Sequence, residues 1–334
     1  MPGHDKKASM PDKSNRQNPG ERIAKVMARA GLASRREAEA WIAAGRVAVN
    51  DAVINSPALN VTASDRIAID GQPLPRRERT RLFRYHKPRG LVTTHSDPEG
   101  RPTIFAALPK DLPRLISVGR LDINTEGLLL LTNDGGLARV LELPATAWLR
   151  RYRVRAKGRV MQPALDNLRA GITVAGVHYG PIEATLDREQ GANVWLTIGI
   201  REGKNREVRK VLETLDLQVN RLIRVAFGPF ELGDLDDGEV KEIESQALGT
   251  ELGEKIVAEA GADFDAPLID HDARAVPSRH SGARPQDREP GIQRHDSPPP
   301  LDSGAPLRGS RNDKKKQPRR DRTGGPRPKY PRQK

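Results

Sequence analysis

The chain has 334 residues, a length for which about two domains are expected. It contains 57 Lys and Arg against 44 Asp and Glu, which gives a net charge of +13. The absence of cysteine excludes a disulfide scaffold, a cysteine-ligated zinc or iron–sulfur site and a cysteine nucleophile. Neither a membrane-spanning run of ~18 apolar residues nor a signal-peptide core is found, so we expect a cytoplasmic protein. The surplus positive charge favours a nucleic-acid partner.

Both ends of the chain differ in composition from the middle. Residues 1–19 are polar and contain almost nothing to bury, which predicts a disordered N-terminal segment. Residues 246–334 are predicted to form a disordered, proline-rich tail whose last part, 311–334, holds eleven Lys and Arg against two Asp, hence 11 − 2 = +9. This basic end is interpreted either as a solubilising tail or as an electrostatic arm that follows RNA phosphates.

The first ordered segment, 20–80, is predicted to be a small domain with its linker. Ser34 and Glu37 form a capping box, which predicts the start of a second helix, and glycines after each helix predict where the helices end. Alternating apolar residues then predict strands. The expected helices cover 21–30 and 34–45, and the expected strands cover 46–49, 52–54 and 66–70.

Basic residues decorate these helices and their exits, either as a solvated face or as RNA contacts. The order of elements and the phrase Ala-Gly-Leu-Ala-Ser-Arg-Arg-Glu-Ala-Glu resemble the small RNA-binding domain first known from the ribosomal small-subunit protein S-four. RNA of the structured kind is read mainly by shape and backbone contacts. The resemblance therefore implies an RNA-binding role for Arg22, Lys25, Arg29, Arg35, Arg36 and Arg46.

The middle region, 81–245, mixes strands and helices without a regular alternation, which predicts an α+β domain on a large mixed or antiparallel sheet. Apolar runs and alternating patterns predict the individual elements. The expected strands cover 82–85, 91–94, 116–118, 127–132, 151–156, 194–200 and 219–227, and the expected helices cover 137–143, 162–170 and 205–215.

Three residues of this region have both a chemical and a structural interpretation. Asp122 lies in a turn at the rim of the sheet with Arg120 close by, but a single Asp in a loop is most often a turn residue. Tyr152 is either a core aromatic or a platform on which a base stacks. Arg206 and Arg209, three residues apart on a helix, belong either to a solvated helix end or to a site. Periodicity alone leaves these alternatives open.

Four motifs resolve them through a resemblance. In chain order they are Lys87-Pro88-Arg89-Gly90, Asp97 to Thr103, Gly119-Arg120-Leu121-Asp122 with Thr125 and the run Gly127 to Gly135, and Glu202 to Arg209. Together they resemble the RsuA/RluB/RluE/RluF family of ribosomal RNA pseudouridine synthases. The resemblance implies that 81–245 is the catalytic domain, that Asp122 is the catalytic carboxylate (a nucleophile), that Tyr152 is the active-site tyrosine, and that Arg209 pairs with the aspartate.

The implied activity is the isomerisation of uridine to pseudouridine in ribosomal RNA, by a monomer that needs neither cofactor nor metal. A carboxylate at that position attacks the sugar or abstracts a sugar proton, and the sequence leaves both routes open. The last motif and the basic tail favour 23S RNA, with 16S RNA as the alternative and a non-catalytic, RNA-binding ribosome-assembly factor as another. Further substrate contacts are expected from Arg120, Thr125, Lys204, Asn205 and Arg206.

Overall fold

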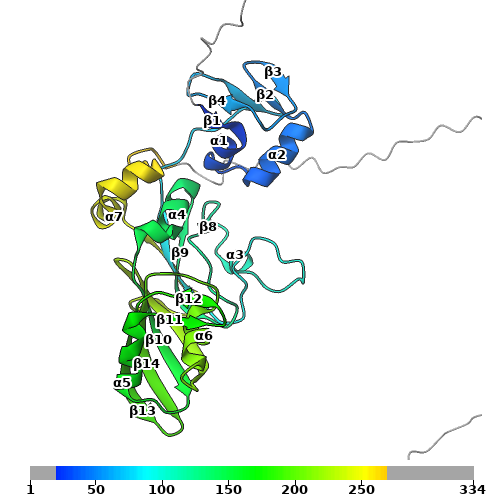
Figure 1. Cartoon of the computed structure of the whole chain (residues 1–334). Helices are drawn as coiled ribbons and strands as arrows, with labels where there is room; N and C mark the ends of the chain where they lie inside the picture. Colours follow the sequence, from blue (N-terminus) through cyan, green and yellow to red (C-terminus); the bar gives the residue numbers. More distant parts are fainter. Residues whose placement is uncertain (1–19, 269–334) are drawn as a thin grey trace, which may run out of the picture. The chain divides into compact units, whose positions relative to one another are not determined.

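The computed structural model describes residues 20–268 (Figure 1). The predicted disordered segment 1–19 and the part of the predicted tail from 269 to 334 lie outside the described residues.

The small part packs two helices against short strands, as predicted. Ser34 and Glu37 form the expected capping box at the second helix, with Glu37 N donating to Ser34 Oγ over 3.1 Å and Ser34 N donating to Glu37 Oε2 over 2.6 Å. The first helix begins two residues later than predicted because Glu21 and Arg22 pair with Asn60–Val61 as strands. The elements are β1 (Glu21–Arg22), α1 (Ile23–Arg29), α2 (Arg35–Ala43), β2 (Val47–Val49), β3 (Ala52–Ile54), β4 (Asn60–Val61), β5 (Ile67–Ile69) and β6 (Gln72–Pro73).

The second part is built on a nine-stranded sheet with the order β13-β14-β10-β15-β9-β7-β17, in which β16 pairs with β15 and β8 pairs with β9. Only β15 and β9 run parallel among the paired strands of this sheet, which confirms the predicted mixed sheet. The strands are β7 (Leu82–Lys87), β8 (Ile116–Ser117), β9 (Glu126–Thr132), β10 (Arg150–Lys157), β13 (Ile182–Gln190), β14 (Asn193–Ile200), β15 (Gln218–Phe227), β16 (Phe230–Glu231) and β17 (Val240–Ile243).

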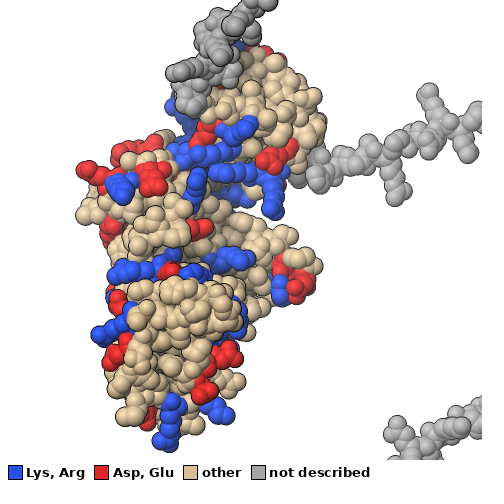
Figure 2. Space-filling model, in the orientation of Figure 1, with Lys and Arg blue, Asp and Glu red and all other residues tan. Residues whose placement is uncertain are grey.

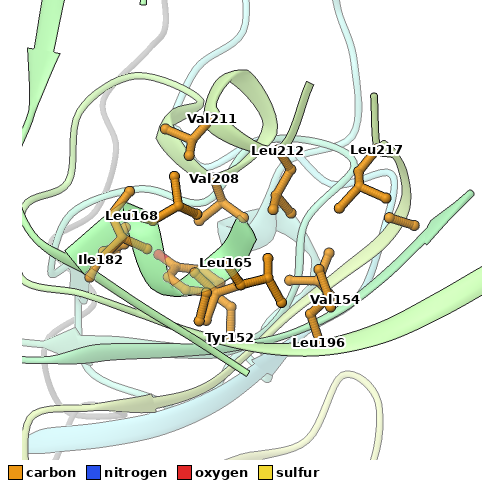
Figure 3. Packing of buried hydrophobic residues seen from close by; sticks show 14 of the residues in the cluster. Tyr152, Val154, Leu165, Leu168, Ile182, Leu196, Val208, Val211, Leu212 and Leu217 are labelled. Atoms are coloured by element: carbon orange, nitrogen blue, oxygen red, sulfur yellow. The ribbon is translucent and has the colours of Figure 1, made fainter. Parts of the chain in front are cut away.

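Helices cover both faces of this sheet because side chains alternate along each strand. On β15, Leu222 belongs to the apolar cluster with Tyr152 and the helices α5 and α6, whereas Ile223 packs into the cluster with α4 and α7 (Figures 1 and 3). The remaining elements are α3 (Ile104–Ala107), α4 (Gly135–Glu142), η1 (Pro144–Thr146), α5 (Gln162–Asp166), η2 (Asn167–Ala170), β11 (Ile172–Val174), β12 (Val177–Tyr179), α6 (Glu207–Glu213) and α7 (Ser245–Ala260).

The helix α7 corrects the predicted boundary of the C-terminal tail at residue 246. Leu248 and Leu252, one helical turn apart, are buried against the apolar cluster that also contains Leu137 and Leu141 of α4. The low aromatic content and high polarity of this stretch concealed two leucines at helical spacing, which are enough to dock a helix. At 91–94 the predicted strand is also wrong: only a single bridge joins Val92 to Thr103.

Gly127 shows how closely the two parallel strands approach one another. Its backbone has φ +100°, and a β-carbon placed there would overlap the backbone of Arg224 on β15. Only glycine accommodates both the dihedral angle and the contact. The close approach brings the Asp122 turn, which immediately precedes β9, next to β15 and its partner β10.

Candidate active site

A cavity of about 770 Å³ opens where the Asp122 turn, β10, β15 and the segment before α6 converge. Seven of the predicted site residues line this cavity, although they are spread over more than eighty residues of sequence. They are Arg120, Asp122, Thr125, Tyr152, Lys204, Asn205 and Arg206. The sheet therefore brings the predicted residues together at one place.

Neighbouring backbone and side chains fix the Asp122 turn from several directions. Within the turn, Thr125 N donates to the carbonyl oxygen of Asp122 over 2.9 Å. From the preceding motif, Gly90 N donates to Ile123 O over 2.8 Å and Thr93 Oγ1 donates to Leu121 O over 2.8 Å. These bonds hold the backbone on both sides of the aspartate, so the carboxylate, which is 38% exposed, projects from a fixed turn.

Lys87 lies beneath this turn and is fully buried. Its ammonium group donates to the carbonyl oxygens of Pro88, over 2.9 Å, and Thr125, over 3.0 Å. Burial lowers the pKa of Lys87 to about 8, while the negative charges of Asp122 and Glu126 oppose that shift. The motif Lys87-Pro88-Arg89-Gly90 contributes to the family resemblance, but the sequence does not predict Lys87 itself as a site residue.

The basic partner of Asp122 differs from the one that the resemblance implied. Arg206 Nη1 lies 3.9 Å from Asp122 Oδ2 and forms the ion pair. Arg209 donates instead to two backbone carbonyls, Val219 O over 3.0 Å and Asn124 O over 3.2 Å, and Asp122 acts on it only through charge. Arg206 reaches the carboxylate because it precedes α6 in the left-handed region, with φ +53°, and so does not share the helical face of Arg209.

Tyr152 combines the two interpretations that the sequence left open. Its ring is buried among Leu165, Val208 and other residues of the apolar cluster, at 8% exposure, and it also lines the cavity (Figure 3). The strand pairing places Arg224 of β15 opposite Tyr152 of β10. A core tyrosine at a cavity wall is held rigidly and can still present its ring edge or hydroxyl to a ligand.

Two buried arginines that the sequence analysis missed stand beside this tyrosine. Arg150 and Arg224 stack on Phe227, with guanidinium carbons 4.8 and 5.0 Å from the ring centre. Arg150 Nη1 donates to Arg201 O over 2.7 Å and to Trp148 O over 3.1 Å. The available signal was a charged residue at an inward-facing position, since Arg224 occupies the same face of β15 as the buried Leu222.

The segment before α6 is ordered by the buried carboxylate of Glu207. Its Oε2 accepts from Lys204 N over 3.0 Å, and burial raises the pKa of Glu207. The Lys204 ammonium donates to His178 O over 2.7 Å and to Glu202 Oε2 over 2.6 Å. The motif therefore builds a firm wall of the cavity, in which Asn205 and Arg206 are exposed.

The basic residues predicted to bind RNA on the small part fall into two groups. Lys25 and Arg29 pair with Glu21, Arg46 pairs with Asp70, and Arg22 donates to the carbonyl of Ala58. Arg35 and Arg36 on α2 are exposed and form no ion pair within 20–268. Figure 2 shows Lys and Arg side chains over the surface of each part, mixed with Asp and Glu.

Two further observations concern metal binding and membrane insertion. Among residues 20–268, no cluster of His, Asp and Glu has the arrangement of a metal site. Nor does any helix of this range have the length and apolarity that a bilayer crossing requires. The side chains that line the cavity include the Asp122 carboxylate, the Tyr152 phenol and several guanidinium groups.

Comparison with known families gives two matches that follow one another along the chain. The S4 domain model matches residues 21–67, and the model described as RNA pseudouridylate synthase matches residues 81–214. The chain is 43% identical over 231 residues to an RNA pseudouridine synthase of Rickettsia prowazekii, covering 69% of this chain and 97% of that protein.

Two other similarities were found. Over 255 residues the chain is 42% identical to the ribosomal large subunit pseudouridine synthase B of Pseudomonas aeruginosa, covering 72% of this chain and 65% of that protein. A solved structure described as a pseudouridylate synthase is 27% identical, with a TM-score of 0.49, and covers 70% of this chain and 100% of that chain.

Proposed function

Because this chain belongs to the RNA pseudouridine synthase family, with an S4 domain ahead of the synthase domain, we propose that it converts a specific uridine of ribosomal RNA to pseudouridine. The observation that carries the proposal is the position of Asp122. Its carboxylate projects from a turn held by Gly90 and Thr93, lies beside Arg206, and lines a cavity that Tyr152 also lines.

The reaction needs only groups that this cavity holds. The bond between N1 of the base and C1′ of the sugar breaks, the base turns, and a new bond joins C5 to C1′. The proton on C5 is lost and N1 gains one, so the product is an isomer of the substrate. Asp122 either attacks C1′ as a nucleophile or removes a proton from C2′ to give a glycal, and both routes require an ionised carboxylate.

Arg206 and Tyr152 support these steps in different ways. The Arg206 guanidinium lies 3.9 Å from the carboxylate and orients it. Tyr152 is proposed to stack on the detached base and to accept the C5 proton. The firm walls of the cavity limit the directions in which the base can turn while it is detached.

The proposed substrate is 23S RNA. Support comes from relatives at about 42% identity that are named ribosomal large subunit pseudouridine synthase B, in Pseudomonas aeruginosa and in Haemophilus influenzae. Bringing a uridine into the cavity requires it to leave its stack, which costs a few kcal/mol and least for a uridine in a loop or bulge. We therefore expect a target in an irregular element of the RNA.

Mapping pseudouridines in both ribosomal RNAs from a strain that lacks this chain tests the proposal. One position of 23S RNA should lack pseudouridine in this strain. Expression of the wild-type chain should restore the modification there, whereas expression of Asp122→Asn should not. Loss of pseudouridine from a position of 16S RNA would instead identify 16S RNA as the substrate. An unchanged map in both RNAs would favour a ribosome-assembly factor that binds RNA without catalysis.

A further inference from the structure

Arg224 is a buried cation at the centre of the active-site wall. It lies on β15, 3% exposed, directly opposite Tyr152 in the pairing of β15 with β10, and it lines the cavity. Its Nε donates to the carbonyl oxygen of Leu128 over 2.7 Å, whereas its Nη2 is buried and has no hydrogen-bond partner among the described residues. One donor of a buried guanidinium is thus left unsatisfied.

Such an arrangement does not stabilise the fold. Burying a charged group without a partner of opposite charge costs several kcal/mol, and an unpaired donor adds to that cost. No described carboxylate forms an ion pair with Arg224, and the nearby Arg150 is a second buried cation. Burial lowers the pKa of Arg224, and the nearby Tyr152 phenol opposes this shift.

We propose that Arg224 is a positioning residue that holds the oxygen of Tyr152 where it can accept the C5 proton. This inference rests on the proposed function. In that step the phenol oxygen takes the proton from C5 while its own hydroxyl proton passes through water to N1. The electrons of the C5–H bond form the C5–C6 double bond, the electron pair of the C6–N1 double bond moves to N1, and Tyr152 ends the step as a neutral phenol.

Positioning is needed because packing fixes the ring but leaves the hydroxyl hydrogen of Tyr152 free to rotate about the C–O bond, so a neighbouring donor has to set the direction of the oxygen lone pairs. A proton acceptor has to stand within hydrogen-bond reach of the proton that it takes, about 2.6–3.2 Å. Packing with Leu165 and Val208 fixes the ring of Tyr152. The Arg224 guanidinium opposite it is itself held by Leu128 O and by stacking on Phe227, so it is a rigid donor for the hydroxyl group. Arg224 therefore acts through Tyr152 and does not itself take the proton.

A double-mutant cycle separates this role from general damage to the core. The variants are Arg224→Met, Tyr152→Phe and the pair, measured by single-turnover formation of pseudouridine at saturating enzyme. Arg224→Met alone should slow the rate about 10- to 100-fold. In the Tyr152→Phe background the same change should slow it less than about twofold, because the oxygen that Arg224 holds is already gone.

Val154→Ala is the matched control. Val154 is the next inward-facing residue of β10 and belongs to the same apolar cluster, but it has no polar contact with Tyr152. Its effect on the rate should be the same in both backgrounds. Arg224→Lys should recover part of the rate, and Arg224→Met should melt no lower than wild type, because replacing a buried unpaired cation by an apolar side chain is often neutral or stabilising.

A second substrate keeps the inference testable if Tyr152→Phe has no measurable rate. In RNA with 5-fluorouridine at the target, C5 carries no proton, so glycosidic cleavage and rejoining proceed without the proton transfer. Arg224→Met should then rearrange the fluorinated target within about threefold of wild type. The inference would be overturned if Arg224→Met lost the same factor in rate on both substrates, or lost its full factor in the Tyr152→Phe background. If the wild-type protein formed no pseudouridine, the proposed function itself would be overturned.

Discussion

Lys87 donates a hydrogen bond of 3.0 Å to the carbonyl oxygen of Thr125, three residues after the proposed catalytic aspartate. Since Thr125 N in turn donates to Asp122 O, the lysine supports the closing end of the turn that carries the carboxylate. The contact links the end of β7 to the start of β9 and explains why a fully buried ammonium group is found under an active site.

The pKa of Lys87 predicts a pH dependence of stability. Its pKa is about 8 in the folded protein against 10.5 for an ordinary lysine, so between these values the unfolded chain binds more protons. The contribution of this residue to the free energy of unfolding should therefore rise as the pH increases from 8 to 10.5, by about 1–3 kcal/mol. Denaturant unfolding of wild type and Lys87→Met at both pH values measures it. An identical pH dependence in the two proteins would mean that Lys87 titrates normally.

Replacing Asp122 by Asn should separate catalysis from binding. The amide keeps the shape of the side chain but can neither attack C1′ nor remove a proton, so turnover should disappear. RNA affinity depends on many phosphate contacts and should stay within about a few fold. Filter binding and tritium release on the same transcript compare the two. An equal loss of affinity and turnover would place the catalytic aspartate elsewhere.

Alanine substitutions of Arg206 and Arg209 should differ in their effects on turnover and on the free energy of unfolding. Arg206 is 51% exposed and touches the fold little, so Arg206→Ala should reduce turnover while the free energy of unfolding changes by less than about 0.5 kcal/mol. Arg209→Ala removes two hydrogen bonds to backbone carbonyls, and unfolding should become easier by about 1–3 kcal/mol. Chemical denaturation and single-turnover rates give both quantities. A catalytic defect confined to Arg209→Ala would restore it as the partner of Asp122.

The exposed arginines of α2 should carry RNA affinity for the small domain. Removing both charges in Arg35→Ala/Arg36→Ala should weaken binding and reduce the slope of log affinity against log salt by about two. Arg66→Ala is the control, because Arg66 is 77% exposed on the same domain but pairs with Asp51. If Arg66→Ala lowered the slope equally, RNA affinity would depend on the net charge of the domain and not on the face of α2.

The sequence alone predicts those helices and strands whose local signals agree with one another. The capping box at Ser34, the apolar run of β9 and the alternation along β10 each predict an element that the structure contains. Local patterns could not show which arginine meets Asp122, because the left-handed backbone at Arg206 turns its side chain away from the helical face of Arg209. The inward arginines 150 and 224 were missed because their significance depends on strands distant in sequence that meet at Tyr152.

Tritium release from ribosomal RNA labelled at C5 of uridine tests the central claim most directly, because forming the C5–C1′ bond expels the hydrogen on C5. Purified wild-type protein should release close to one tritium per target uridine from a 23S transcript or a large-subunit assembly intermediate, and Asp122→Asn, folded and RNA-bound, should release none. No release by the wild-type protein from 23S or 16S RNA, naked or in assembly intermediates, would contradict the account.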